Sequence, residues 1–209
     1  LRAAPAAVAC SCHTRYVGPV DEWLYDQTID ETRLNAGLIG VDGRLHGPSH
    51  HGSVMSRSKA YRDVGGYRAA FYFAQDLDLW TRLAEVGPFK VVDECLYQAR
   101  LEPQSISGTQ TREQSQLAEL IALATQARRM GKTESDVLSE ASDIRPLKRA
   151  GLEARVAKGN YFIGSCLVRR DPSAAIMYFR KALDHDPWHW RARLRWLQLN
   201  LLKPGKCSR

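Results

Sequence analysis

The spacing of apolar residues changes once along the chain, near residue 108. Before that point, short alternating or fully apolar runs predict strands over 6–19, 22–28, 53–57 and 89–101. After it, apolar residues recur at the helical spacing in REQSQLAELIALATQARRMG and over 145–170, 172–185 and 187–202. The pattern therefore predicts an α/β unit followed by an all-helical extension.

Helical and loop stretches separate the predicted strands. A short helix over 28–40 starts near Thr28 or Asp30, a turn of helix in SKAYRDVGGY is stopped by Gly65 and Gly66, and a helix over 75–87 ends at Gly87-Pro88. The Gly, Pro and Ser content of 42–52 predicts a loop, and GKTESDVLSEASDI is polar enough to predict a linker. The expected organisation is 1–107 as one domain, 108–144 as a long helix and linker, and 145–209 as a helical tail.

Charge separates the same two parts. Of a net charge of +7, residues 1–107 carry 11 basic and 13 acidic side chains, whereas 108–209 carry 19 and 10. Such a basic helical surface is most simply solvated, but it can also meet an acidic protein, an anionic membrane surface or nucleic acid. Nucleic acid is the least favoured partner, because only RARLRWLQL (191–199) interleaves basic residues with an aromatic one.

Cysteine usage favours a reducing compartment. The five cysteines are odd in number and irregular in spacing, which argues against a disulfide framework, and Cys10, Cys12 and His13 fit no zinc motif. No apolar run reaches the ~20 residues of a membrane span, and no signal peptide is recognisable. We expect a cytoplasmic protein, at most peripheral to the inner face of the membrane. Because the first residue is Leu, we also expect a processed chain or a piece of a longer one.

One carboxylate is unexpected for its position. In FYFAQDLDLWTRLAEVG (71–87), Asp76 lies on the same helical face as Leu79, Trp80 and Leu83. Asp is a favoured N-cap, so Asp76 could simply cap a helix over 77–87. It could equally present a free oxygen to a substrate.

Four stretches together resemble the C-terminal half of the GT-A fold in family-2 glycosyltransferases. They occur in the family's order and spacing within 1–107, as HGSVMSR (51–57), VGGYR (64–68), AQDLDLWTRL (74–83) and LYQARLEPQSIS (96–107). The resemblance implies that Asp76 is the catalytic base of an inverting sugar transfer. Such a base takes the acceptor proton from within ~3 Å of the attacking oxygen. The first turn of a helix directs the carboxylate and favours its ionised form.

The resemblance also implies roles for neighbouring residues. His51, Gly66 and Tyr67 would border the acceptor pocket, although a loop His is often only solvated and paired glycines most simply end a helix. Asp78 and Arg82 are four residues apart and can form an ion pair. Asp78 is then structural or orients the acceptor, and Arg82 reaches a phosphate or braces the helix.

Two positions depart from the family pattern. Gln75 replaces the Glu that precedes the base, and Glu102 stands where many relatives have a His near the metal and diphosphate. A carboxylate can ligate a hard cation but repels phosphate. Arg100 is the better candidate for diphosphate contact, because a guanidinium binds phosphate in a bidentate manner.

The family's nucleotide-binding half, with its Asp-x-Asp metal motif, is not recognisable in the sequence. The resemblance implies Mg²⁺ or Mn²⁺ and a nucleotide-diphosphate sugar for the complete protein, but no metal ligand is expected in this chain. We therefore expect the acceptor half of a transferase, a fragment without the donor-binding half.

The tail carries a second, weaker resemblance. Residues 160–187 resemble one tetratricopeptide unit through Ala175, Phe179, Ala182 and Pro187. Because about three units make a free-standing stack, we expect a helical cap, with protein docking or membrane contact as alternatives. The tryptophans of the tail are expected in a core or groove, with sugar stacking as the alternative, namely Trp188, Trp190 and Trp196.

The sequence thus predicts part of an inverting glycosyltransferase that acts on a glycan acceptor, as in cell-surface polysaccharide synthesis. The alternative is a non-catalytic helical interaction module that carries a relic transferase domain.

Overall fold

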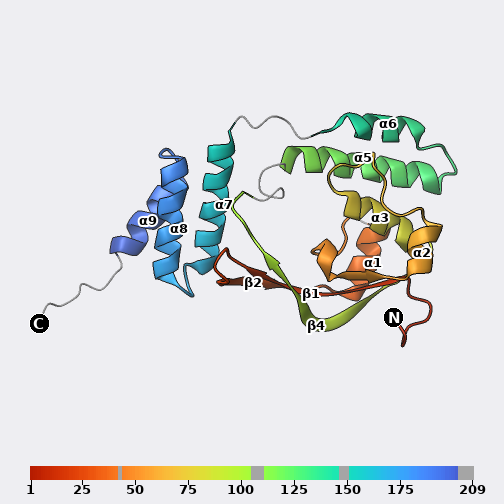
Figure 1. Cartoon of the computed structure of the whole chain (residues 1–209), viewed down its shortest axis with the longest axis horizontal. Coiled ribbons are helices and arrows are strands. Elements are labelled where there is room, and N and C mark those ends of the chain that lie inside the picture. Colours follow the sequence, from red (N-terminus) through yellow and green to blue (C-terminus); the bar gives the residue numbers. More distant parts are fainter. Residues whose placement is uncertain (42–43, 105–110, 146–150, 202–209) are drawn as a thin grey trace, which may run out of the picture. The chain divides into compact units, whose positions relative to one another are not determined.

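A computed structural model describes residues 1–41, 44–104, 111–145 and 151–201, and Figure 1 shows their course. The chain divides into two compact units. The first comprises 1–15, 26–99 and 110–147, and the second comprises 16–25, 100–109 and 148–209. The combination of strands and helices confirms the expected mixture of an α/β part and a helical part.

The strands lie where the apolar alternation predicts them. They are β1 (Ala9–Val17), β2 (Trp23–Gln27), β3 (Val54–Ser56) and β4 (Phe89–Arg100), and they form one sheet in the described part of the chain. The order is β2-β1-β3, and β4 pairs with β1 as well. β1 and β3 are antiparallel, with Ala9 opposite Ser56 and Ser11 opposite Val54. A short 3₁₀ helix, η1 (His51–Ser53), leads directly into β3.

Three helices pack on this sheet within the first unit: α1 (Glu31–Ile39), α2 (Ser58–Asp63) and α3 (Gln75–Ala84). Asp30 caps α1 by accepting a hydrogen bond from the Arg33 amide at 2.8 Å, and Gly40 ends the helix at a positive φ of 69°. Buried apolar side chains join the helices to the sheet, namely Val8, Ala9, Leu34, Leu38, Ala60, Leu79, Trp80, Leu83 and Phe89.

α3 is shorter than the predicted helix over 75–87. Its last turn tightens through hydrogen bonds from the Glu85 amide to the Arg82 carbonyl and from the Val86 amide to the Leu83 carbonyl. The helix therefore ends at Ala84, before Gly87 and Pro88 are reached.

A second layer of the first unit contains α5 (Thr111–Arg129) and α6 (Ser135–Asp143), and Figure 1 shows them running side by side beyond α3. The prediction of a linker over 131–144 is therefore wrong, because most of this segment is helical. Val137, Leu138 and Ala141 form a narrow apolar stripe on α6 that packs against a core centred on Phe71, Phe73, Leu117, Leu120, Ile121 and Ala124. Packing on α5 stabilises a helix whose own sequence is mostly polar.

The described part of the second unit contains three successive helices: α7 (Leu152–Leu167), α8 (Pro172–His185) and α9 (Trp190–Leu201). Asp171 accepts a hydrogen bond from the Ala174 amide at 2.9 Å, and Pro172 opens α8 in its first turn. Phe179 is fully buried against α7, together with Ala175 and Ala182. A Cβ atom on Gly164 would lie 2.9 Å from the Phe179 ring, so the two helices approach closely because position 164 has no side chain.

Two of the three tail tryptophans contradict the prediction of core or groove positions. Trp188 is 85% exposed and Trp190 is 66% exposed, whereas Trp196 is half-buried. The helical spacing alone did not reveal which face of α9 packs on α8.

Candidate functional site

Asp76 lies in the first turn of α3 and does not cap the helix. The residue at the N-cap position is Ala74, whose φ of 56° is left-handed and whose side chain makes no capping hydrogen bond. The capping hypothesis for Asp76 is therefore wrong. Its side chain is 31% exposed and lies at the positive end of the helix.

Two histidines at the start of η1, its N-cap residue His50 and its first residue His51, lie near this carboxylate. His51 Nδ1 lies 3.9 Å from Asp76 Oδ2, and the ring centroids of His50 and His51 are 4.4 Å apart. The His50 ring also lies 5.0 Å from the ring of Tyr97 on β4. A Cβ atom on Gly52 would lie 2.3 Å from the Tyr97 ring, so this arrangement requires a residue without a side chain at position 52. The start of η1 is thus held against β4 beside Asp76.

The turn after α2 supplies a tyrosine to the same place. Gly65 and Gly66 have φ values of 81° and 64°, a backbone conformation that other residues rarely adopt. The turn places Tyr67 with its ring 6.0 Å from Tyr61 in an edge-on arrangement, about half exposed. Burial raises the pKa of the Tyr67 hydroxyl, and the negative charge of Asp76 raises it further.

Burial also raises the pKa of Asp76 above its ordinary value, whereas the positive charges of His51 and His50 act in the opposite direction. The pKa of His50 is lowered by its own burial and by His51, against a smaller upward effect of Asp76. A raised pKa makes a carboxylate a stronger proton acceptor while it remains ionised.

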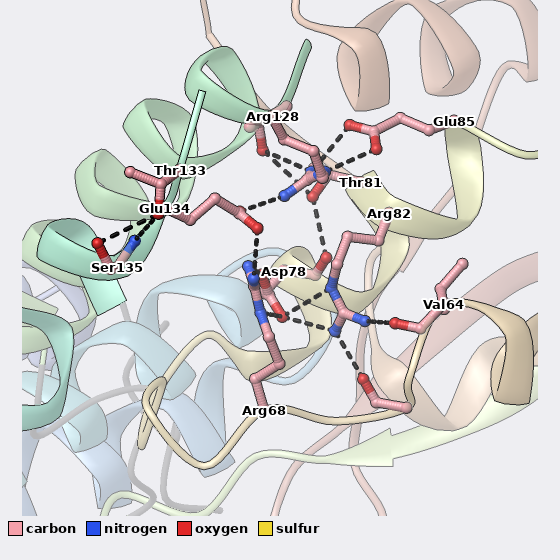
Figure 2. Close-up of polar contacts among 12 residues, drawn as sticks. Val64, Arg68, Asp78, Thr81, Arg82, Glu85, Arg128, Thr133, Glu134 and Ser135 are labelled. Atoms are coloured by element: carbon pink, nitrogen blue, oxygen red, sulfur yellow. Dashed lines mark hydrogen bonds and ion pairs between the residues drawn. The ribbon is translucent and has the colours of Figure 1, made fainter. Parts of the chain in front are cut away.

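Two residues after Asp76, Asp78 belongs to an ion-pair network that joins α3 to the Gly65-Gly66 turn (Figure 2). Asp78 is 1% exposed and accepts hydrogen bonds from both Arg68 and Arg82, including one of 2.6 Å from Arg82 Nη2. Arg82 also donates to the carbonyl oxygens of Val64 at 2.5 Å and Gly66 at 2.7 Å. One guanidinium therefore fixes the turn that precedes Tyr67 to the helix that carries Asp76.

The network continues into the second layer. Arg68 Nη1 donates to Glu134 Oε2 at 3.0 Å, and Arg128 Nη1 donates to Glu134 Oε1 at 2.6 Å. Arg128 also binds Glu85 through two hydrogen bonds of 2.6 and 2.8 Å. Acidic and basic side chains thus alternate from Asp78 on α3 through Arg68 and Glu134, at the start of α6, to Arg128 on α5 (Figure 2).

The structure brings some of the predicted residues together and leaves others elsewhere. His51 and Tyr67 lie close to Asp76 in the first unit, whereas Gly66, directly before Tyr67, is buried, as are Asp78 and Arg82. Because Asp78 and Arg82 are buried and bonded to each other and to the backbone, they have a positioning role and do not present free groups to a ligand.

Arg100 belongs to the second unit, where its guanidinium has internal partners. It donates to the carbonyl oxygens of Gly18 and Pro19 and to the carboxylate of Asp21 at 2.6 Å. Glu102 is exposed. The rest of the expected closing loop, residues 105–107, lies outside the described residues.

Sequence reasoning missed Arg68, Tyr97 and the carboxylate of Glu134. Arg68 and Tyr97 occur inside two of the quoted motifs, so their place beside the others was a usable signal. Glu134 occurs in the segment expected to be a linker, and no local pattern marks a partner 66 residues away from Arg68.

The described cavity of the first unit does not coincide with the residues around Asp76. A groove of about 430 Å³ in the first unit lies between the end of α1 and α5, lined by Ile39, Leu45, Leu123 and Met130 among others, and none of the predicted site residues lines it. Within the described residues, no group of three or more His, Cys, Asp or Glu side chains is placed to hold a metal ion.

No family model matches this sequence, and no curated protein matches it either. Among the described helices, none is both long enough and apolar enough to cross a bilayer.

Proposed function

We propose that the chain contributes Asp76 as the general base of an inverting sugar transfer from a nucleotide-diphosphate sugar to an acceptor hydroxyl. The observation that carries the proposal is convergence. Three stretches of the family resemblance, around residues 51, 67 and 76, meet at one partly exposed carboxylate whose pKa is raised.

In the proposed step one bond forms, one bond breaks and one proton is transferred. As the acceptor oxygen bonds to the anomeric carbon, its proton passes to the carboxylate of Asp76. The bond from that carbon to the diphosphate breaks, and its electron pair leaves with the diphosphate. Attack opposite the leaving group inverts the anomeric centre. General-base assistance of this kind contributes about 10²–10⁴ in rate.

The other site residues position this step. His51 faces the carboxylate and stabilises its ionised form when protonated, while Tyr67 and Tyr97 offer hydroxyl groups and ring faces of the kind that sugars contact. Asp78, Arg68 and Arg82 are positioning residues, because they act only through the helix and turn that they join.

The family resemblance implies Mg²⁺ or Mn²⁺ for the complete enzyme. The described residues do not fit such an ion, since they provide no cluster of ligands. No step proposed for this chain passes through a metal, and the roles proposed for its residues concern the acceptor and not the donor sugar.

The test is transfer from a panel of nucleotide-diphosphate sugars to saccharide acceptors, in the presence of Mg²⁺ or Mn²⁺. Asp76→Asn should lower the transfer rate about 10²–10⁴-fold, as expected for the loss of a general base. The matched control is Asp63→Asn, which changes an exposed carboxylate on α2 that pairs with Lys59 at the surface, and it should leave the rate unchanged. Equal rates for wild type and Asp76→Asn would contradict the base assignment. If the wild-type chain transfers sugar from none of the donors in the panel, the alternative of a non-catalytic interaction module is favoured.

A further inference from the structure

The outward face of α9 carries an apolar stripe that nothing else in the described chain covers. Its side chains are Trp190 (66% exposed), Leu194 (48%), Leu197 (44%) and Leu201 (82%), and Trp188 stands in the turn before the helix. These four helical positions are spaced by four, three and four residues, so they lie in one line along the helix. A stripe of this width on a small helical unit is unusual unless it has a partner.

The stripe is separate from the face that packs on α8. Ala192 is fully buried, and Trp196 and Leu199 are half-buried, and all three lie on the side of the helix opposite the stripe. α9 therefore has one apolar face for its own core and a second one directed outward.

Positive charge flanks the stripe on both sides. Arg191 lies on one side and Arg193 on the other, and both are exposed. The sequence from Pro187 to Arg209 contains no Asp or Glu. Arg195 lines a cavity of about 330 Å³ together with Arg169 and Arg170, at the end of α7. Each of these features favours an anionic partner.

We infer that α9 and the preceding turn bind an anionic membrane surface, lying parallel to it. A basic helix with a Trp- and Leu-rich outward face inserts that face at the boundary of headgroups and acyl chains, while its arginines remain at the phosphates. Tryptophan is enriched at that boundary, and two of the most exposed side chains here are tryptophans. Nucleic acid would match the arginines but would leave the leucines in water. The inference is independent of the proposed transferase activity.

Vesicle flotation of the full chain tests this inference. The chain should float with vesicles of phosphatidylcholine plus phosphatidylserine, should not float with phosphatidylcholine alone, and should be released by added salt. Leu197→Glu should weaken binding about ten-fold or more, because it removes buried apolar area and adds a repelled charge. The matched control is Met177→Glu on α8, which alters an apolar side chain of 56% exposure outside the stripe and should bind as wild type does.

A second pair of variants tests the charges. Arg191→Glu should weaken binding at least about five-fold, from the contribution of one basic residue near an anionic surface. Arg180→Glu makes the same change on an exposed position of α8 and should have less effect. Circular dichroism should show that all four variants keep the wild-type helix content.

Several results would overturn the inference. These are no flotation with anionic vesicles, equal flotation with both vesicle types, or equal losses in the stripe variant and its control. Sedimentation provides a further check. If the chain is a dimer that Leu197→Glu dissociates, the stripe is a contact between two copies and not a membrane surface.

Discussion

The carboxylate of Asp78 and the guanidinium of Arg82 face each other one turn apart on α3, and Arg82 uses its remaining donors to hold the carbonyl groups of Val64 and Gly66. This pair connects a helix to a turn that comes earlier in the chain. The helix carries Asp76 and the turn carries Tyr67. The position of Tyr67 relative to the candidate base Asp76 therefore depends on the side chains of Asp78 and Arg82, which are almost completely buried.

The first prediction concerns that pair. Asp78→Ala leaves the buried guanidinium of Arg82 and the partly buried one of Arg68 without their shared carboxylate, and it should reduce the free energy of unfolding by about 3–5 kcal/mol. Urea unfolding followed by circular dichroism measures this loss. Asp63→Ala removes a carboxylate from an exposed pair with Lys59 and should change the free energy of unfolding by no more than about 0.5 kcal/mol. Similar losses in both variants would contradict the structural role of Asp78.

The two glycines before Tyr67 should differ in their response to alanine. Gly65 and Gly66 both have positive φ, so each substitution should cost about 1 kcal/mol of backbone strain. At Gly66 the added Cβ would also lie 2.9 Å from the Tyr61 ring, whereas at Gly65 it would meet nothing within 4 Å. Gly66→Ala should therefore destabilise the protein clearly more than Gly65→Ala in thermal unfolding. Equal effects would show that Tyr61 moves aside freely.

The raised pKa of Asp76 predicts a stability cost at neutral pH. A carboxyl group whose pKa is higher in the folded state binds its proton more tightly there than in the unfolded chain. Its contribution to stability therefore falls as the pH rises from the unfolded value of 3.8 through the folded value, and above that window the cost is fully present. Asp76→Asn, which cannot ionise, should be more stable than wild type at neutral pH.

The pH dependence provides the check on that prediction. The stability advantage of Asp76→Asn should shrink as the pH falls through the folded pKa of Asp76 and should be lost below the unfolded value of 3.8, because the carboxyl group is then protonated in both the folded and the unfolded wild type. Urea unfolding at neutral and acid pH measures this difference. An asparagine variant that is less stable than wild type at neutral pH would show that the helix N-terminus and the histidines outweigh the effect of burial.

The helix pair of the second unit depends on position 164. Gly164→Ala would place a methyl group 2.9 Å from the Phe179 ring and 3.2 Å from the Ala175 carbonyl oxygen, so α7 and α8 would have to separate. We expect a loss of about 1–3 kcal/mol, which is typical of overpacking in a core. Ser165→Ala, at the adjacent exposed position, should cost much less. A stabilised Gly164→Ala variant in chemical unfolding would contradict the close approach of these helices.

Much of the fold could be predicted because local patterns dominate it. The strands and most helices coincide with apolar spacing and with turn residues such as Gly40 and Pro172. α6 was missed because its apolar stripe is only Val137, Leu138 and Ala141, and its stability depends on α5, which no local pattern reveals.

The site was less predictable than the fold. The family resemblance selected His51, Tyr67 and Asp76, which the structure places together, but it could not distinguish a ligand-binding Arg82 from a buried one. That distinction depends on the positions of the Val64 and Gly66 carbonyl groups, which are set by tertiary packing. The outward stripe of α9 was obscured for a similar reason, since Trp190 and Trp196 look alike in sequence but only one of them is largely exposed.

The most direct test of the base assignment is the pH dependence of the transfer rate, measured in parallel for wild type and Asp76→Asn with one active pair of donor and acceptor. The wild-type rate should fall on the acid side as the carboxylate gains a proton, at a pH above the ordinary range for aspartate. The asparagine variant should be slower throughout and should lack that acid limb. An unchanged acid limb in Asp76→Asn would show that another group takes the acceptor proton.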